Sequence, residues 1–214
     1  MPDINKLTIE KEPVVIRGKK IVVVKPAKLE EIFQGDPFLN VEGFPFWFKI
    51  WEAGIVLADY VASVPPVKKI LEIGAGLGVP SLVAAAFGHD VLATEYQELP
   101  LEFIKRSAEE NNLKLRTAIL DWTNPQIDEK FDLIIGAEVV FKKSLFMPLI
   151  ELFKKLLKDD GEVIIAHNTE RKRVLVPFLY YAQQEFDIMS SVRKIHGDGE
   201  TVEVVLNKLV FKKN

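Results

Sequence analysis

The segment LEIGAGLGVP, residues 71–80, places three glycines within five positions and an acid just before them. The glycines are Gly74, Gly76 and Gly78. Glycines between a strand and a helix let the backbone approach a ligand closely, although a tight turn without a ligand would also use them. Dinucleotide-binding loops have the pattern G-x-G-x-x-G/A, and Val79 breaks that pattern here. The acid, Glu72, would repel a pyrophosphate, so the segment favours a ligand with positive charge near the loop.

Two more acids close the apolar runs that follow. Glu95 ends the run DVLATE, residues 90–95, and stands 21 positions after Gly74. An acid at about that distance accepts hydrogen bonds from ribose hydroxyls, although a solvated glutamate at a strand end would look the same. Asp121 and Trp122 close the next run, where Asp121 is expected to accept the adenine amino group and Trp122 to lie against the ring. The alternative is a turn aspartate followed by a tryptophan that only packs.

Alternating strand and helix patterns begin near residue 68 and must position these acids. Continuous apolar runs predict buried parallel strands, and the segments between them predict helices that cover the sheet. The expected strands are 68–73, 90–95, 115–120, a run from 131, 162–168, and two final strands from 187 joined by the turn 196–199. The expected helices are 79–88, 99–112, 144–161 and 171–186. This alternation indicates an α/β fold with a mixed sheet and helices on both faces.

The first fifty residues carry a different pattern. Two β-branched runs flank Arg17-Gly18-Lys19-Lys20 within 14–24 and predict a β-hairpin. A short helix is expected over 29–33, a loop rich in Gly, Pro and Phe over 34–46, and a helix over 51–64. Residues 1–50 are too few for a sizeable core, so an N-terminal extension or cap is expected beside a main domain of residues 51–214.

Composition narrows the class of protein. The chain has 214 residues, no cysteine and a net charge of -3, from 28 basic and 31 acidic residues. Without thiols there are no disulfides, thiolate nucleophiles or Cys-ligated zinc, and the three histidines lack a metal-binding spacing. The charge balance gives no support for a nucleic-acid partner. The N-terminus lacks the features of a signal peptide and no apolar stretch would span a membrane, so a cytoplasmic protein without metal is expected.

These motifs resemble those of the class I S-adenosylmethionine-dependent methyltransferases. The resemblance runs from about Trp51 to Phe141 and rests on LEIGAGLG, on Glu95 as the second acid, on Asp121-Trp122 and on FDLIIGAEVVF. It implies a Rossmann-like, seven-stranded sheet with the last strand antiparallel, and S-adenosyl-L-methionine as the cofactor. It also implies that a sulfonium and an amine, rather than a phosphate, meet the acid of the loop. The implied cofactor residues are Trp51, Glu72, Gly74, Ala75, Gly76, Gly78, Glu95, Tyr96, Asp121, Trp122 and Ala137.

A narrower resemblance is to the lysine methyltransferase-like group, which includes enzymes that modify lysines of translation factors and chaperones. The segments FPFWFKIWEAGIVLADYV, LDW and GAEVVF carry it. In this group the tryptophan that matches Trp51 lies beside the cofactor, and an Asp-x-x-Tyr segment follows the fourth strand. That segment reads Glu138-Val139-Val140-Phe141 here, so the resemblance implies Glu138 and Phe141 as the catalytic acid and aromatic group.

The resulting prediction is an enzyme that N-methylates a protein side chain, a lysine, by in-line transfer. Alternatives are a small-molecule N- or O-methyltransferase, a non-catalytic cofactor-binding protein and an NAD-dependent oxidoreductase. The Asn-Pro-Pro-Tyr-type motif is absent, which argues against DNA adenine and glutamine acceptors. Residues 1–50 and the loop 168–173 are expected to select the acceptor. His167 is either a base or a packing residue, and Phe46–Phe48 either attract a cation or pack.

Overall fold

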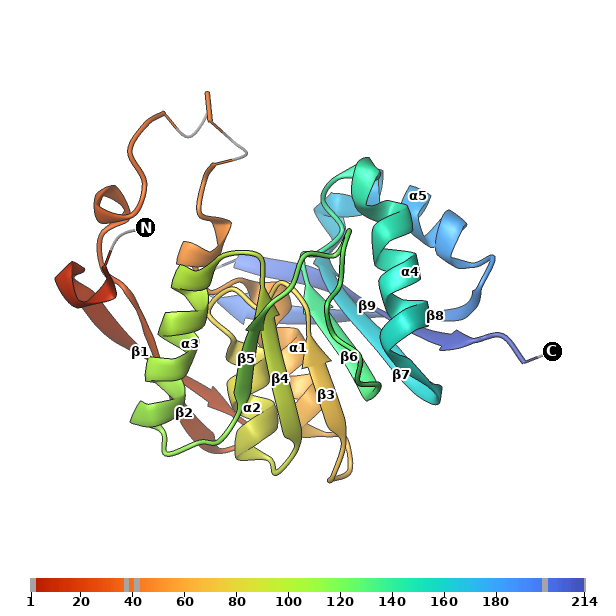
Figure 1. Cartoon of the computed structure of the whole chain (residues 1–214), viewed down its shortest axis with the longest axis horizontal. Coiled ribbons are helices and arrows are strands. Elements are labelled where there is room, and N and C mark those ends of the chain that lie inside the picture. The colour runs from red at the N-terminus through yellow and green to blue at the C-terminus, as the bar shows by residue number, and fades with distance from the viewer. Residues whose placement is uncertain (1–2, 37–38, 41–42, 198–199, 214) are drawn as a thin grey trace.

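A seven-stranded sheet forms the centre of the molecule (Figure 1). The computed structural model describes residues 3–36, 39–40, 43–197 and 200–213. The strand order is β5-β4-β3-β6-β7-β9-β8. Five strands are parallel: β3 (Lys69–Glu72), β4 (Asp90–Glu95), β5 (Arg116–Ile119), β6 (Phe131–Ala137) and β7 (Leu157–Asn168). The last strand, β9 (Glu200–Phe211), runs antiparallel between β7 and β8 (Phe186–Gly197), which confirms the predicted mixed sheet with an antiparallel last strand.

Helices cover both faces of this sheet, as predicted. Neighbouring residues of a strand point to opposite faces, and Ile70 packs with α1 (Glu52–Ala62) whereas Leu71 packs with α4 (Phe146–Leu156) and α5 (Lys172–Ala182). The helices α2 (Val79–Ala86) and α3 (Glu98–Glu110) lie on the α1 side. No helix in the described part of the chain is long and apolar enough to cross a membrane.

Two helix predictions were too long at their carboxyl ends. The helix predicted over 144–161 ends at Leu156, and residues 157–161 belong to β7, where Leu157 pairs with Phe131 across a register irregularity. The two aspartates and the glycine of residues 158–161 have weak helix propensity, and the register of β7 with β6 skips these residues, passing from Leu157 to Glu162. The helix predicted over 171–186 ends at Ala182, and Phe186 starts β8. The turn predicted over 196–199 lies partly outside the described residues.

The N-terminal hairpin is present and docks on the helix layer. The strands β1 (Ile9–Ile16) and β2 (Lys19–Pro26) pair through a two-residue turn at Arg17 and Gly18, whose φ values are 47° and 79°. Ser107 of α3 and Asn111, the residue after its end, bond the β2 backbone, since Val24 N donates to Ser107 Oγ at 2.8 Å and Val22 N donates to Asn111 Oδ1 at 2.8 Å. The short helix predicted over 29–33 is a single 3-10 turn, Leu29–Glu31.

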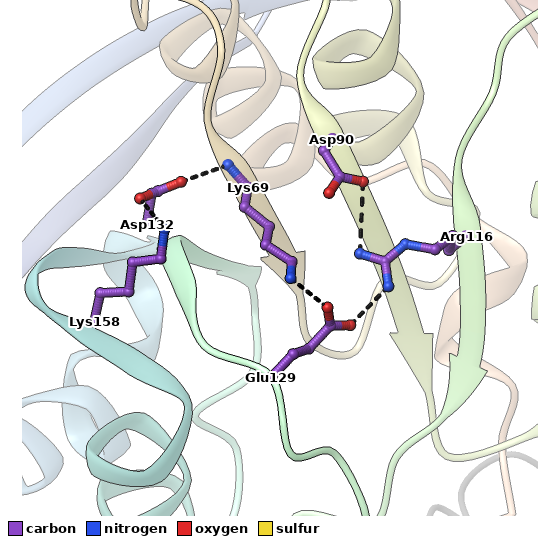
Figure 2. A network of polar contacts seen from close by, with 6 residues as sticks. All are labelled: Lys69, Asp90, Arg116, Glu129, Asp132 and Lys158. Atoms are coloured by element: carbon purple, nitrogen blue, oxygen red, sulfur yellow. Dashed lines mark hydrogen bonds and ion pairs between the residues drawn. The ribbon is translucent and has the colours of Figure 1, made fainter.

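Ion pairs connect the amino ends of the parallel strands (Figure 2). The members are Lys69, Asp90, Arg116, Glu129, Asp132 and Lys158. The two carboxylate oxygens of Glu129 lie 2.5 Å from Lys69 Nζ and 2.7 Å from an Arg116 nitrogen. Asp132 accepts hydrogen bonds from Lys69 N at 2.7 Å and from Lys158 Nζ at 2.8 Å. Each of these carboxylates therefore has a cationic partner.

Candidate active site

The glycine loop leaves β3 at the carboxyl edge of the sheet in left-handed backbone conformations. Gly74, Gly76 and Gly78 have φ values of 57°, 56° and 71°. A Cβ added at Gly74 would lie 3.2 Å from Val139 and 3.3 Å from the ring of Trp122, tighter than most such contacts. One at Gly76 would lie 3.5 Å from Trp47 Cβ. The loop is thus enclosed by side chains that come from three other parts of the chain.

Glu72 lies beneath this loop and is 1% exposed. Its Oε2 accepts a hydrogen bond from Ser81 N in the first turn of α2, at 2.9 Å. Burial raises the pKa of Glu72 to about 8, and the charge of Glu95 adds to the increase while the Ser81 hydrogen bonds oppose it. At pH 7 the carboxyl therefore holds its proton, and a cation nearby would favour its ionised form.

Glu95 ends β4 and points at the loop. Its Oε1 accepts from Gly76 N at 2.9 Å and its Oε2 from Tyr96 N at 2.8 Å. Burial raises its pKa, against the effect of these backbone N–H groups. Tyr96 beside it is 70% exposed, and Ala75 N donates to the carbonyl oxygen of Thr94 at 2.9 Å. The acid predicted for the ribose and the glycine loop are therefore in direct contact.

Asp121 and Trp122 follow β5 at the same edge. Asp121 Oδ1 accepts hydrogen bonds from Thr123 N at 2.8 Å and Thr123 Oγ1 at 2.7 Å, and the pKa of Asp121 is lowered by these bonds. Asp121 thus stabilises the turn that follows β5. The ring of Trp122 packs over Gly74 and lies 6.2 Å from the ring of Phe141, centroid to centroid. Trp122 therefore forms one wall of the site, and an adenine contact by either residue stays a prediction.

The segment before α1 supplies a wall that the sequence interpretation did not assign. Trp47 covers Gly76, and its Nε1 donates to Gln97 Oε1 at 3.2 Å. Trp51, the predicted cofactor neighbour, precedes α1 and donates from Nε1 to the carbonyl oxygen of Phe46 at 2.8 Å. The aromatic run FPFWF indicates that this segment packs against something, but only the tertiary structure shows that Trp47 packs on the glycine loop.

Glu138 and Phe141 leave β6 directly after Ala137, its last residue. Glu138 has a φ of 56°, which is uncommon for a residue with a side chain. Its Oε1 accepts from Asn168 N at 2.7 Å, and its Oε2 lies 3.5 Å from Arg171 Nε. Burial raises the pKa of Glu138 and Glu52 adds to that effect, while Asn168 and Arg171 oppose it. Phe141 is 53% exposed, so the turn presents an acid and an open aromatic face.

The residues around the loop fit a cofactor that carries positive charge. Within the described residues, the carboxyls of Glu72 and Glu95 accept hydrogen bonds from backbone N–H groups rather than from cationic side chains. The three glycines carry no side chain, so the loop offers backbone to a ligand at these positions, beside the walls formed by Trp122 and Trp47. Over the same described ranges, no group of three or more His, Asp or Glu side chains could hold a metal ion.

Comparisons with known proteins show the family to which this chain belongs. The family model described as lysine methyltransferase matches residues 46–185. The mouse protein N-lysine methyltransferase METTL21A is 28% identical over 162 residues, covering 71% of this chain and 72% of its own. The Kluyveromyces lactis protein N-terminal and lysine N-methyltransferase EFM7 is 27% identical over 203 residues, covering 75% of each chain.

A solved structure shares the fold and the cofactor class. The TehB-like SAM-dependent methyltransferase from Corynebacterium glutamicum superimposes with a TM-score of 0.59 at 25% identity, covering 77% of this chain and 89% of its own. The matched region contains the glycine loop, Glu95, the Asp121-Trp122 turn and the Glu138–Phe141 turn. The chain therefore belongs to the lysine methyltransferase family, and it is an S-adenosylmethionine-dependent methyltransferase.

Proposed function

We propose that this enzyme N-methylates a lysine side chain of a protein. The observation that carries the proposal is the turn after β6, where Glu138 and the open face of Phe141 stand next to Trp122 at the edge of the glycine loop. A carboxylate and an aromatic face are the groups that attract an ammonium. The relatives METTL21A and EFM7, which bear lysine methyltransferase names, support a lysine as the acceptor.

On the cofactor side, we assign binding to the glycine loop and the acids around it. When bound, S-adenosylmethionine supplies an activated methyl group on a positively charged sulfur, so the protein chiefly orients the partners and excludes water. Glu95 would hold the ribose hydroxyls, and Asp121 with Trp122 would hold the adenine. Ala75, Tyr96, Ala137 and Trp51 complete the proposed cofactor site.

On the acceptor side, the lysine must lose a proton before it can act as a nucleophile. An ammonium with a pKa of about 10.4 costs roughly 4 to 5 kcal/mol to deprotonate at pH 7. We assign Glu138 to hold this ammonium and, after the ammonium has released its proton to solvent, to direct the free amine. Arg171 is the cation near Glu138 Oε2 in the free enzyme, so the acceptor would take its place there. Phe141 lacks the hydroxyl of tyrosine and contributes only its ring face.

The surroundings of the acceptor are also part of the proposal. We divide the chain into an N-terminal extension, residues 1–50, and a main domain, residues 51–214. We assign selection of the acceptor to the extension and to residues 168–173. The exposed cations Arg171, Lys172 and Arg173 suit an acidic protein surface rather than a nucleic acid, given the overall charge of the chain. We place the activity in the cytoplasm.

Transfer of a labelled methyl group from S-adenosylmethionine into cell lysate tests this function. We expect a protease-sensitive labelled band whose hydrolysate contains methyl-lysine, and about a hundredfold loss of rate in Glu138→Gln, as for a positioned acid–base group. Glu151→Gln, an exposed acid on α4, serves as the matched control. Label found in methyl-arginine, or in protease-resistant small molecules, would contradict the lysine proposal.

A further inference from the structure

The turn that carries Glu138 and Phe141 is held from the neighbouring strand. Glu138 N donates to the Ala166 carbonyl oxygen at 2.8 Å, and Asn168 N donates to Glu138 Oε1 at 2.7 Å. A left-handed glutamate persists only where its surroundings supply several such contacts. The carboxyl end of β7 therefore determines where the acid of the proposed acceptor site points.

His167 stands between these two residues and makes the third contact. Its Nε2 accepts a hydrogen bond from Val140 N at 3.0 Å, and the side chain is completely buried. Because Nε2 accepts, the proton of the neutral imidazole is on Nδ1. Among the described residues, Nδ1 has no hydrogen-bond partner. Burial, aided by the positive charge of Arg171, lowers the pKa of His167 to about 3, so the ring stays neutral.

This arrangement leaves His167 without the means to act as a base. The lone pair of Nε2 is directed at Val140 N, and Nδ1 already carries the proton. Val139 and Val140 are 2% and 1% exposed, so the middle of the turn is packed into the core and Phe141 emerges from it. A shift of Val140 would move both ends of the turn.

We propose that His167 is a positioning residue, which fixes the Glu138–Phe141 turn for the acceptor by accepting the Val140 N–H bond. The inference rests on the proposed function for its effect on methyl transfer, but the hydrogen bond itself can be tested without any acceptor. A glutamine at this position can still accept the bond, whereas a leucine fills the space without accepting it.

The first experiment measures the hydrogen bond in the whole protein. Nitrogen-15 spectra of the histidine rings should show His167 neutral, with its proton on Nδ1, from pH 5 to 8. Amide exchange at Val140 should be slow in the wild type and in His167→Gln, and fast in His167→Leu. A proton on Nε2, titration of the ring in this pH range, or slow exchange in the leucine variant would overturn the inference.

The second experiment separates positioning from base catalysis. With labelled transfer into lysate protein as the probe, His167→Leu should lower kcat about tenfold, the effect of one lost buried hydrogen bond, with unchanged affinity for the demethylated cofactor. His167→Gln should recover most of the rate with the same pH profile. Equal loss in both variants, with Val140 protected in the glutamine variant, would overturn the positioning role. If the wild type labels no protein lysine, the proposed function fails, while the spectra and exchange still decide whether His167 holds the turn.

Discussion

Acidic side chains have different partners and oppositely shifted pKa values at the two edges of the parallel sheet. At the carboxyl edge, burial raises the pKa values of Glu72 and Glu95, and their hydrogen-bond donors are backbone N–H groups. At the amino edge, burial acts on Glu129 and Asp132 in the same direction, but hydrogen bonds and charges from lysine and arginine lower their pKa values. Within the described residues, β3 and β4 thus begin near acids that have cationic partners and end at Glu72 and Glu95, whose hydrogen-bond donors are backbone N–H groups.

The backbone differs between the edges as well. Among the described residues, the carboxyl edge holds four residues with positive φ, the three loop glycines and Glu138, whereas the amino edge holds Gly88 and Asn112. Each edge also contains a buried histidine with one ring nitrogen that has no hydrogen-bond partner in the described part of the chain, His167 at Nδ1 and His89 at Nε2. Such features cost stability and are typical of functional sites. At the amino edge, ion pairs connect Glu129, Asp90 and Asp132 to lysine and arginine side chains (Figure 2). The ion pairs of the amino edge therefore support the fold, whereas the carboxyl edge is where we propose that the ligands bind.

Replacing Glu72 by glutamine should produce the largest change in stability. The unfolded chain ionises near 4.5 while the folded protein keeps the proton to about 8, so wild-type stability falls as pH rises through this window. The loss that Glu72 causes between pH 5 and 8 amounts to roughly 3 kcal/mol and should disappear in Glu72→Gln. Denaturant unfolding without cofactor at several pH values measures it. Glu95 and Glu138, whose pKa values are also raised, contribute to the pH dependence in both proteins, so only a loss as large in Glu72→Gln as in the wild type would mean that Glu72 is ionised in the free enzyme.

Gly76→Val should weaken cofactor binding about a hundredfold, or roughly 3 kcal/mol. The new Cβ points at Trp47 and the backbone is strained at φ 56°, so the Gly76 N–H group turns away from Glu95. Calorimetry with the demethylated cofactor measures the affinity. The control is Gly88→Val at the amino edge, with φ 92° and open space around its Cβ, which should lose stability but not affinity. Unchanged binding by Gly76→Val would remove the loop from the site.

The two ends of β4 provide a third comparison. Glu95→Ala should cost roughly 1 to 3 kcal/mol of cofactor affinity, because it removes hydrogen bonds to a charged group. Asp90→Ala, at the other end of the strand, loses only a 3.5 Å contact with Arg116 and should bind the cofactor as the wild type does. Equal affinities in these two variants, measured by the same calorimetry, would contradict the ribose role of Glu95.

The smallest effect is expected at the amino edge. Glu129→Gln removes the carboxylate that pairs with Lys69 and Arg116. The substitution should lower the free energy of unfolding by about 1 kcal/mol at pH 7, without a change in cofactor affinity. Because the pKa of Glu129 is lowered, its contribution is present above the unfolded value near 4.5 and is lost as pH falls through the folded pKa. Urea titrations at pH 7 and pH 3 should therefore show a smaller difference between variant and wild type at pH 3.

Much of the fold could be predicted because strand and helix periods are local properties. The alternation from residue 68, the hairpin and the glycine loop follow from residue order alone. The extension of β7 through residues 157–161 could not be predicted, because Lys-Asp-Asp-Gly is typical of a helix end, whereas in the structure Leu157 pairs with Phe131 and the register then skips to Glu162. Local patterns do not report such pairing.

Some contacts of the candidate site could likewise be predicted from the sequence, and others could not. Glu95 and Gly76 meet because parallel strands end at a common edge, which the sequence period already implies. Trp47 on Gly76 and the hold of β7 on Glu138 depend on the register of distant segments, so no local pattern reveals them. The role of Glu72 also needed its burial to be known, because only burial makes the carboxyl keep its proton.

The three tryptophans of the chain, Trp47, Trp51 and Trp122, all lie around the carboxyl edge. Intrinsic ultraviolet emission from this protein is therefore a label-free optical report on that edge alone. Cofactor titrations can follow the emission of the native chain, with each tryptophan replaced in turn by phenylalanine to apportion the signal. Melting followed by emission would report the opening of the carboxyl edge, whereas far-ultraviolet circular dichroism would report the sheet. A difference between the melting midpoints from emission and from circular dichroism would show that the carboxyl edge opens before the sheet unfolds.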